Sequence, residues 1–345
     1  MTAVPMIRSA DGPRSTADFV SRLLRFREVG IAALLAVLLV AVRLAAPRFW
    51  SVSNIQIIAL SIALLLVVAV GETVVILGRN FDLTVGSTVG LSAMTVGMVF
   101  KSYSGLPTIV AIAIAIVVGL VVGAINGMMV AYLRVPSVVL TLGMLSVISG
   151  ATYLVADGNQ VNPFNVPERF VELSINSPIG VPAIVIIAIV FAVLVELALR
   201  WSRFGRSLFA FGSNPEAAQL RGLSARSLII ASFVLSGGAA GLGGAMYLSQ
   251  YGLVQDSAGA GIELQAITIA IVGGVSVFGG SGSILGTAIA CALLGSMANG
   301  IAVLGFSSFW QDAMYGLLLI LSVVASAVSR RLQSSRALAR PELKL

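Results

Sequence analysis

The polar residues that could do chemistry in this chain are few, and four of them interrupt one apolar stretch. Glu72, Arg79, Asn80 and Asp82 lie within GETVVILGRNFDLTVGSTVGLSAM, residues 71–94. A charge at the centre of a membrane span costs about 2.5–3.5 kcal/mol on insertion scales, so such charges persist where they pair, line water or lie at an interface. Arg79 and Asp82 are spaced to pair, and Glu72 and Asp82 are the acids that a proton-coupled carrier would use.

Glycines lie next to these polar residues and are also frequent in a second stretch nearer the C-terminus. Gly86 and Ser87 would let backbones approach closely or would break a helix, and a second Gly-rich stretch, IVGGVSVFGGSGSILGTAIA, spans residues 271–290. Each stretch is either a re-entrant element beside a translocation route or a simple turn between spans. The candidate pathway residues are Asp82, Asn80, Gly86, Ser87, Gly279 and Gly280.

The residue types that are missing exclude several kinds of site. The chain has no His and a single Cys, Cys291. Imidazole metal ligands, imidazole proton relays, thiolate zinc sites and disulfides within the chain are therefore excluded. Lys occurs only at Lys101 and Lys344, and neither lies in a GxxxxGK[ST] loop. We expect no catalytic, cofactor-binding or metal-binding residues, and any ATP that drives this protein must be hydrolysed by a separate subunit.

Composition places these residues in a membrane protein. Of 345 residues, 58% are hydrophobic and 10% are charged, against about 25% charged in an average soluble domain. A soluble protein of this length would need a charged surface that this chain cannot supply. The net charge of +7 does not indicate nucleic acid, because the basic residues lie at the termini and in short loops rather than in one patch.

The apolar runs predict an all-α polytopic protein with about ten transmembrane helices, since each crossing needs about 20 apolar residues. The expected spans are 29–46, 54–77, 84–104, 106–132, 136–156, 182–199, 227–249, 263–279, 283–305 and 308–328. With the N-terminus inside, only Arg43, Arg48, Lys101 and Arg169 of the 21 lysines and arginines fall outside. This asymmetry predicts an even number of spans and two cytoplasmic termini.

The expected organisation is a cytoplasmic tail (1–28), a transmembrane domain (29–328) and a basic cytoplasmic tail (329–345). Residues 15–28 read as an amphipathic helix on the inner membrane surface, with a disordered basic tail as the alternative. The dipeptides Asn126-Gly127 and Asn299-Gly300 both follow Gly-rich runs five spans apart, which suggests a possible inverted repeat.

The longest inner loop, residues 200–226, carries the most informative local pattern. Asn214 suits an N-cap, Pro215 the first helical position, Glu216 the positive helix end and Gly222 the left-handed C-cap. The pattern predicts a helix over 215–221, too short to cross a membrane or to be stable alone. It is either a coupling helix for a cytosolic motor subunit or a connector along the membrane surface. The candidate coupling residues are Asn214, Pro215, Glu216, Ala217, Ala218, Gln219, Leu220, Arg221 and Gly222.

From about residue 30 to 330, the chain resembles the permease subunits of bacterial ABC importers for monosaccharides, of the ribose and xylose type. The resemblance rests on GRNFDLTVGSTVGLSAM, NGMMVAYLRVPSVVLTLGMLSVISG and GRSLFAFGSNPEAAQLRGL, followed by IAIVGGVSVFGGSGSILGT. The sequence departs from many relatives at Arg79-Asn80-Phe81, where they have Gly-Gly-Ile, so its substrate preference could differ from ribose. Related systems carry rhamnose or the furanosyl signal autoinducer-2.

The resemblance implies a bacterial inner-membrane protein that is half of a dimeric pathway, with a second permease subunit of the same or a different kind. It also implies a cytosolic ATPase that binds the inner loop, with ATP bound by that partner, and a periplasmic sugar-binding protein that delivers cargo. Membrane lipid is the expected surroundings. The alternative functions are an ion- or proton-coupled secondary transporter that works alone and a structural or signalling membrane protein, which the lack of a sizeable soluble domain disfavours.

Overall fold

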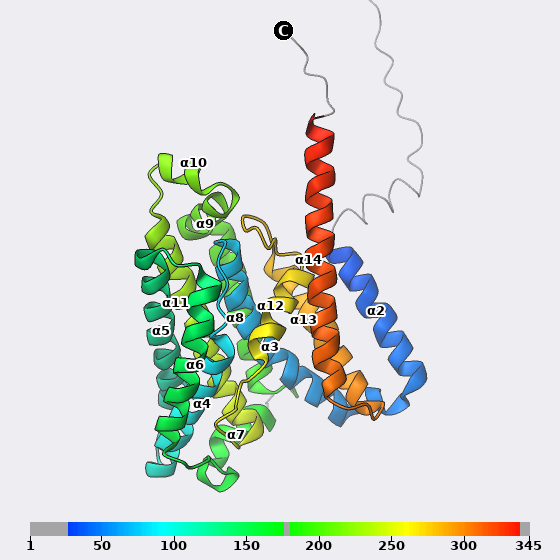
Figure 1. Ribbon diagram of the computed structural model, residues 1–345. Helices are drawn as coiled ribbons and strands as arrows, with labels where there is room; N and C mark the ends of the chain where they lie inside the picture. The colour runs from blue at the N-terminus through cyan, green and yellow to red at the C-terminus, as the bar shows by residue number, and fades with distance from the viewer. Residues whose placement is uncertain (1–26, 176–179, 339–345) are drawn as a thin grey trace, which may run out of the picture.

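The structure is a computed structural model that describes residues 27–175 and 180–338, and it is built from helices (Figure 1). The described part contains one isolated antiparallel bridge, between Val161 and Val254, and no longer strand. The all-α prediction is therefore confirmed. The helices are α2 (Arg27–Ala45), α3 (Val52–Leu77), α4 (Val85–Ser102), α5 (Thr108–Leu133), α6 (Ser137–Ala156), α7 (Glu168–Ile175), α8 (Ala183–Trp201), α9 (Arg203–Ser213), α10 (Pro215–Leu220), α11 (Ala225–Tyr251), α12 (Ile262–Val272), α13 (Ile284–Val303) and α14 (Phe309–Leu338), with short 3-10 turns at Pro47–Trp50 and Pro163–Asn165.

Among the described residues, eight helices are long and apolar enough to cross a membrane. They are α2, α3, α5, α6, α8, α11, α13 and α14. Two further predicted spans correspond to α4, which contains Lys101 and several Ser, Thr and Gly residues, and to the shorter apolar helix α12. The structure thus agrees with a polytopic membrane protein, and the count near ten stays a prediction.

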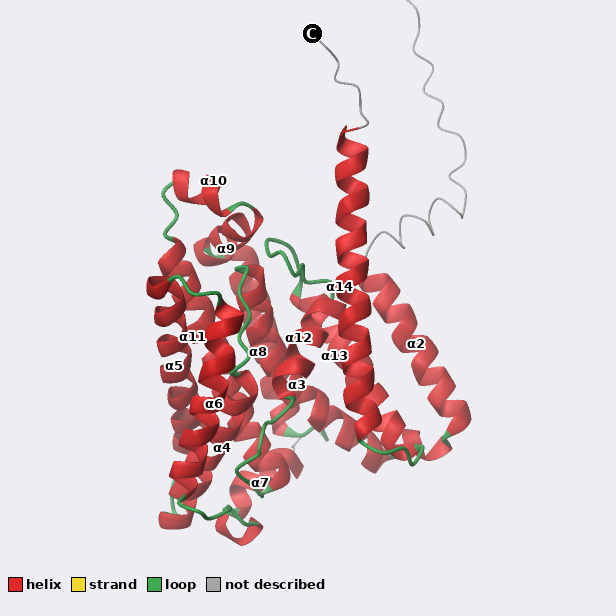
Figure 2. Cartoon of the chain, viewed as in Figure 1, coloured by secondary structure: helices red, strands yellow, loops and turns green. Residues whose placement is uncertain are grey.

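Helix α12 is shorter than the sequence predicts. Its 11 residues span about 16 Å at 1.5 Å per residue, roughly half of a bilayer's hydrocarbon core. The helix ends at Val272 because two glycines follow, and Gly274 adopts a φ of +97° that other residues rarely take. The expected span 263–279 is therefore wrong in its second half, which belongs to a loop over residues 273–283 (Figure 2).

Both ends of the described chain lie on one face of the helical assembly. The start of α2, the end of α14 and the helices α9 and α10 occupy this face, whereas α7 lies at the opposite one (Figure 1). The arrangement fits an even number of crossings. We call the α9–α10 face inner and the α7 face outer, following the charge distribution. Residues 15–26 of the predicted amphipathic helix lie outside the described residues, as do the last residues of the basic C-terminal tail, and Arg27 and Glu28 are the first residues of α2.

Helix α11 packs most closely against α5, through glycines on both helices. A Cβ atom on Gly119 would lie 2.0 Å from the carbonyl oxygen of Gly237, and one on Gly237 would lie 2.2 Å from that of Gly119. Gly123 and Gly241 are in similarly close contact with the opposite backbone. In lipid, small residues permit the close backbone approach that holds such helices together. These contacts fix α11 as the central support for the site described below.

Candidate functional site

The helix predicted in the inner loop is present as α10, from Pro215 to Leu220. The Asn214 side chain accepts a hydrogen bond from the backbone N–H of Ala217 at 3.1 Å, as an N-cap should. Arg221 occupies the C-cap position, one residue earlier than predicted, and Gly222 follows with a φ of +81°. The local signals therefore place this helix correctly to within one residue.

Helix α10 projects from the inner face with little support from the rest of the molecule (Figure 1). Ala218 is its only buried residue, and it packs with Phe211 and Leu228. Leu220, by contrast, is 90% exposed. Helix α10 therefore presents an apolar side chain to the surroundings at the inner face.

A second inner helix, α9, precedes α10 and escaped the sequence interpretation. Ser202 caps it by accepting a hydrogen bond from the backbone N–H of Gly205 at 3.0 Å. Phe204, Leu208 and Phe211 then recur at helical spacing, and Leu208 and Phe211 are buried. The cap and this spacing are the signals that could have predicted the helix.

Arg79 connects the end of α3 to the end of α9. Its Nε donates to the carbonyl oxygen of Gly212 at 2.6 Å, and its Nη2 donates to that of Ser213 at 3.0 Å. A cation at the last carbonyls of a helix is favourable because these groups carry the negative end of the helix dipole. Arg79 and Asp82, which the spacing would allow to pair, do not pair, because the guanidinium turns to α9 while Asp82 turns into the protein.

The loop over 273–283 joins the same inner junction. The N–H of Gly280 donates to the carbonyl oxygen of Leu77 at 3.0 Å, and the Ser213 hydroxyl donates to the carbonyl oxygen of Gly280 at 3.3 Å. A Cβ atom on Gly280 would lie 2.4 Å from the backbone nitrogen of Ser213, so only glycine fits. The ends of α3 and α9 and the Gly-rich loop thus form one connected unit directly beside α10.

Asp82 lies at the centre of a buried polar cluster. Its carboxylate accepts hydrogen bonds from the N–H and hydroxyl of Thr84, at 3.0 and 2.5 Å, and from the Ser236 hydroxyl at 3.4 Å. Its own N–H donates to Glu72 Oε1 at 3.1 Å, and Asn126 donates to the Thr84 hydroxyl at 2.8 Å. The cluster ties together α3, α5, α11 and the segment before α4.

This cluster shows how the first interrupted stretch is arranged. Asp82 is 1% exposed and lies beside Glu72, a residue inside α3, so residues 78–84 fold back along the helix that they leave. Asn80 is also buried, and its side chain donates to the carbonyl oxygen of Gly78 at 2.8 Å. Residues 78–84 thus fold back with Asn80, Asp82 and Thr84 buried and Arg79 exposed at the inner junction.

The remaining candidate pathway residues lie in two other places. A Cβ atom on Gly86 would lie 2.0 Å from Glu263 Oε2, which places Gly86 against the start of α12, and Ser87 lines a small cleft with Glu263. Gly279 and Gly280 belong to the inner junction instead. The six residues predicted as a pathway therefore do not surround one cavity.

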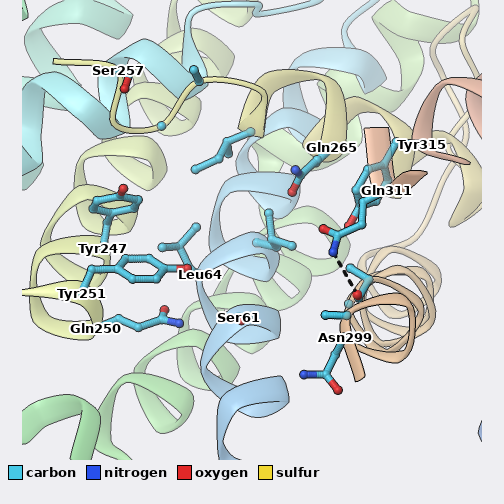
Figure 3. A pocket seen from close by; sticks show the side chains of 17 residues that line it. Ser61, Leu64, Tyr247, Gln250, Tyr251, Ser257, Gln265, Asn299, Gln311 and Tyr315 are labelled. Carbon is cyan, nitrogen blue, oxygen red and sulfur yellow. Dashed lines mark hydrogen bonds between the residues drawn. The ribbon is translucent and has the colours of Figure 1, made fainter. Parts of the chain in front are cut away.

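A cavity of about 390 Å³ that the sequence interpretation missed lies toward the outer ends of the helices (Figure 3). Its walls come from α3, α11, α12, α13, α14 and the segment between α11 and α12. Gln250, Gln265 and Gln311 contribute polar side chains from helices rich in apolar residues. Glutamine within such helices is the signal that could have directed attention to this region.

Comparison with known proteins adds a family to this geometry. Residues 54–323 match the family described as "Branched-chain amino acid transport system / permease component". The chain is 33% identical over 290 residues to the autoinducer 2 import system permease protein LsrC of Salmonella typhi, covering 84% of this chain and 82% of the relative. It is 33% identical over 296 residues to LsrC of Escherichia coli O157:H7, covering 85% of each. No solved structure matches the chain.

Proposed function

The chain belongs to the permease-component family of these transport systems, as a permease subunit of an ABC importer in the bacterial inner membrane, and from this premise we propose its cargo and its working partners. The proposed cargo is a small sugar or sugar-like solute of the ribose, xylose, rhamnose or autoinducer-2 type. Similarity over most of the chain to autoinducer 2 import permeases is the observation that carries this choice.

The ATPase partner is proposed to dock on the inner face at α10. Helix α9 and its hydrogen bonds with Arg79 would connect α10 to the membrane domain. Three features support this choice: the capped helix, its exposed Leu220, and the hydrogen bonds from Arg79 to the α9 carbonyls. Force applied to α10 would pass through Asn214 into α9, and from α9 through Arg79 to the end of α3. The chain has no P-loop of its own, so ATP is proposed to be bound and hydrolysed by this partner.

Two further partners complete the proposed importer. A second permease subunit, identical or related, provides the other half of the pathway, and a periplasmic binding protein delivers the solute at the outer face. Membrane lipid surrounds the apolar helices, and the permease itself needs no cofactor. Similarity to import-system permeases supports this assembly.

The alternative is a secondary transporter that uses Glu72 and Asp82 as coupling acids. The buried cluster gives these acids a different use, because they hold residues 78–84 against α3 through hydrogen bonds to backbone and hydroxyl groups. The family of the chain also favours the importer.

Reconstitution separates the two functions. We expect proteoliposomes that contain the permease, its ATPase and a binding protein to accumulate radiolabelled solute only with ATP inside. D-ribose, D-xylose, L-rhamnose and autoinducer-2 would each be supplied. ATP-dependent accumulation of one of them supports the proposal, whereas accumulation by the purified permease alone, without ATPase or ATP, would overturn it.

A further inference from the structure

The outer cavity is lined by elements that are distant in the sequence. Ser61 and Leu64 of α3 form one wall, Gln250 and the neighbouring tyrosines of α11 form a second, and Gln311 and Tyr315 of α14 lie across from them (Figure 3). Ligand pockets in proteins commonly measure about 300–1,000 Å³, so a volume of about 390 Å³ suits a solute of monosaccharide size.

Polar side chains with unused hydrogen-bonding capacity face this cavity. The Oε1 atom of Gln250 is buried and has no hydrogen-bond partner among the described residues. Buried polar atoms in native proteins nearly always have a hydrogen-bond partner, and those without one commonly have an explanation in function. Further donors and acceptors with no side-chain hydrogen bond in the described part of the chain come from Ser61, Ser257, Gln265, Tyr247, Tyr251 and Tyr315.

The cavity also lacks charge. None of its 17 lining residues is Asp, Glu, Lys or Arg. The start of α12 borders the cavity at Ile262, and Glu263, which is not in the lining, accepts a hydrogen bond through Oε1 from the N–H of Gly261 at 3.1 Å. With no charged side chain in the lining, neither a solute carboxylate nor a solute ammonium group would find a counter-ion there.

Two of the three tyrosines in the lining form an aromatic pair. Tyr247 and Tyr251 lie one helical turn apart, with ring centroids 4.6 Å apart and planes tilted by 49°. Tyrosine combines an apolar ring with a polar hydroxyl, so this pair offers both a surface for the C–H groups of a sugar ring and hydrogen bonds for its hydroxyls.

We propose that this cavity is a solute-binding site for a neutral, polyhydroxylated molecule of monosaccharide size, and that it excludes free amino acids. The inference rests on the proposed import function and assigns it a place on this chain. It distinguishes the carbohydrate-like cargo from the branched-chain amino acids named in the family description, since those carry both a carboxylate and an ammonium group.

Thiol protection tests the site on the purified permease without its partners. In a Cys291→Ala background, Ser257→Cys introduces a thiol in the cavity lining, and Ser53→Cys introduces one on the exposed outer part of α3. We expect millimolar D-ribose, L-rhamnose or autoinducer-2 to slow maleimide labelling of Ser257→Cys at least threefold, while L-leucine has no effect. Labelling of Ser53→Cys should not change with any solute.

Uptake by the complete importer provides the second arm. Gln250→Leu removes the unpaired amide, and its control is Gln56→Leu, the same substitution at an exposed position of α3 outside the cavity. One or two lost hydrogen bonds to solute predict an initial uptake rate about five- to tenfold lower for Gln250→Leu and unchanged for Gln56→Leu.

The outcomes separate this inference from the function on which it rests. Wild-type import of one of the neutral solutes, with no protection of Ser257→Cys and a normal rate in Gln250→Leu, would overturn the cavity assignment and leave the importer function standing. Import of L-leucine in place of the neutral solutes, or protection by L-leucine, would overturn the cargo class and with it this inference.

Discussion

Replacing Asn214 with alanine should weaken ATPase docking without disturbing the membrane domain. The substitution removes the side-chain oxygen that accepts from the Ala217 N–H at 3.1 Å. Loss of an N-cap costs about 1 kcal/mol. Helix α10 has six residues and one buried side chain, so little else stabilises it. The cost should therefore appear in docking affinity, as a dissociation constant about fivefold higher.

The assay is titration of fluorescently labelled ATPase against the permease in lipid nanodiscs. Asn214→Asp is the first control, because aspartate caps helices as well as asparagine and should bind like the wild type. Ser224→Ala is the second control. It removes the same kind of N-cap from α11, where the Ser224 hydroxyl accepts a hydrogen bond from the backbone N–H of Ser227 at 3.3 Å. Helix α11 has 27 residues and is supported by the rest of the bundle, so losing this cap should not affect docking. Equal affinity for Asn214→Ala and wild type, or equal weakening by alanine and aspartate, would refute the reasoning.

Three further predictions concern α10, the buried cluster and the glycine interface. Glu216→Lys places a cation at the positive end of α10, and Gly222→Val places a β-branched residue at a φ of +81°. Each substitution should reduce ATPase co-purification at least twofold while membrane insertion stays normal. Unchanged ATPase recovery in both variants would contradict a coupling role. Asp82→Ala removes the acceptor of three hydrogen bonds and should lower uptake or assembly severalfold, measured by transport and membrane level; wild-type values for both would leave Asp82 without a role. Gly237→Ala should destabilise the fold by about 1–3 kcal/mol, because its Cβ would lie 2.2 Å from a carbonyl oxygen of α5. Gly143→Ala is the control, because its Cβ would meet nothing within 4 Å. Equal melting temperatures of the two variants in detergent would contradict the close packing.

The elements that sequence predicted best are those set by short-range rules. Apolar runs of about 20 residues placed the long spans, because lipid requires every crossing helix to be long and apolar. The ends of α10 followed from Asn214, Pro215 and Gly222, because capping and proline geometry act within a single helical turn. The Ser202 cap and the spacing of Phe204, Leu208 and Phe211 obey the same rules, so α9 was also within reach of the sequence.

The partners of the polar residues depended on distant chain segments. Arg79 and Asp82 are three positions apart, yet the arginine contacts carbonyl oxygens more than 130 positions later and the aspartate contacts Ser236. Spacing along the chain showed that the two could pair, but it carried no information about competing partners brought in by the fold.

The sequence by itself determined that this chain is a helical membrane protein, that it contains no P-loop motif, and that a capped helix lies in its inner loop. These properties follow from composition and from interactions within one helical turn. Only the tertiary structure decided that residues 78–84 fold back beside Glu72, that α12 is a half-length helix, and that α3, α11 and α14 line a cavity without charged residues. Each of these depends on close approach between segments far apart in the chain, for which the sequence supplies the small and polar residues but not the pairing.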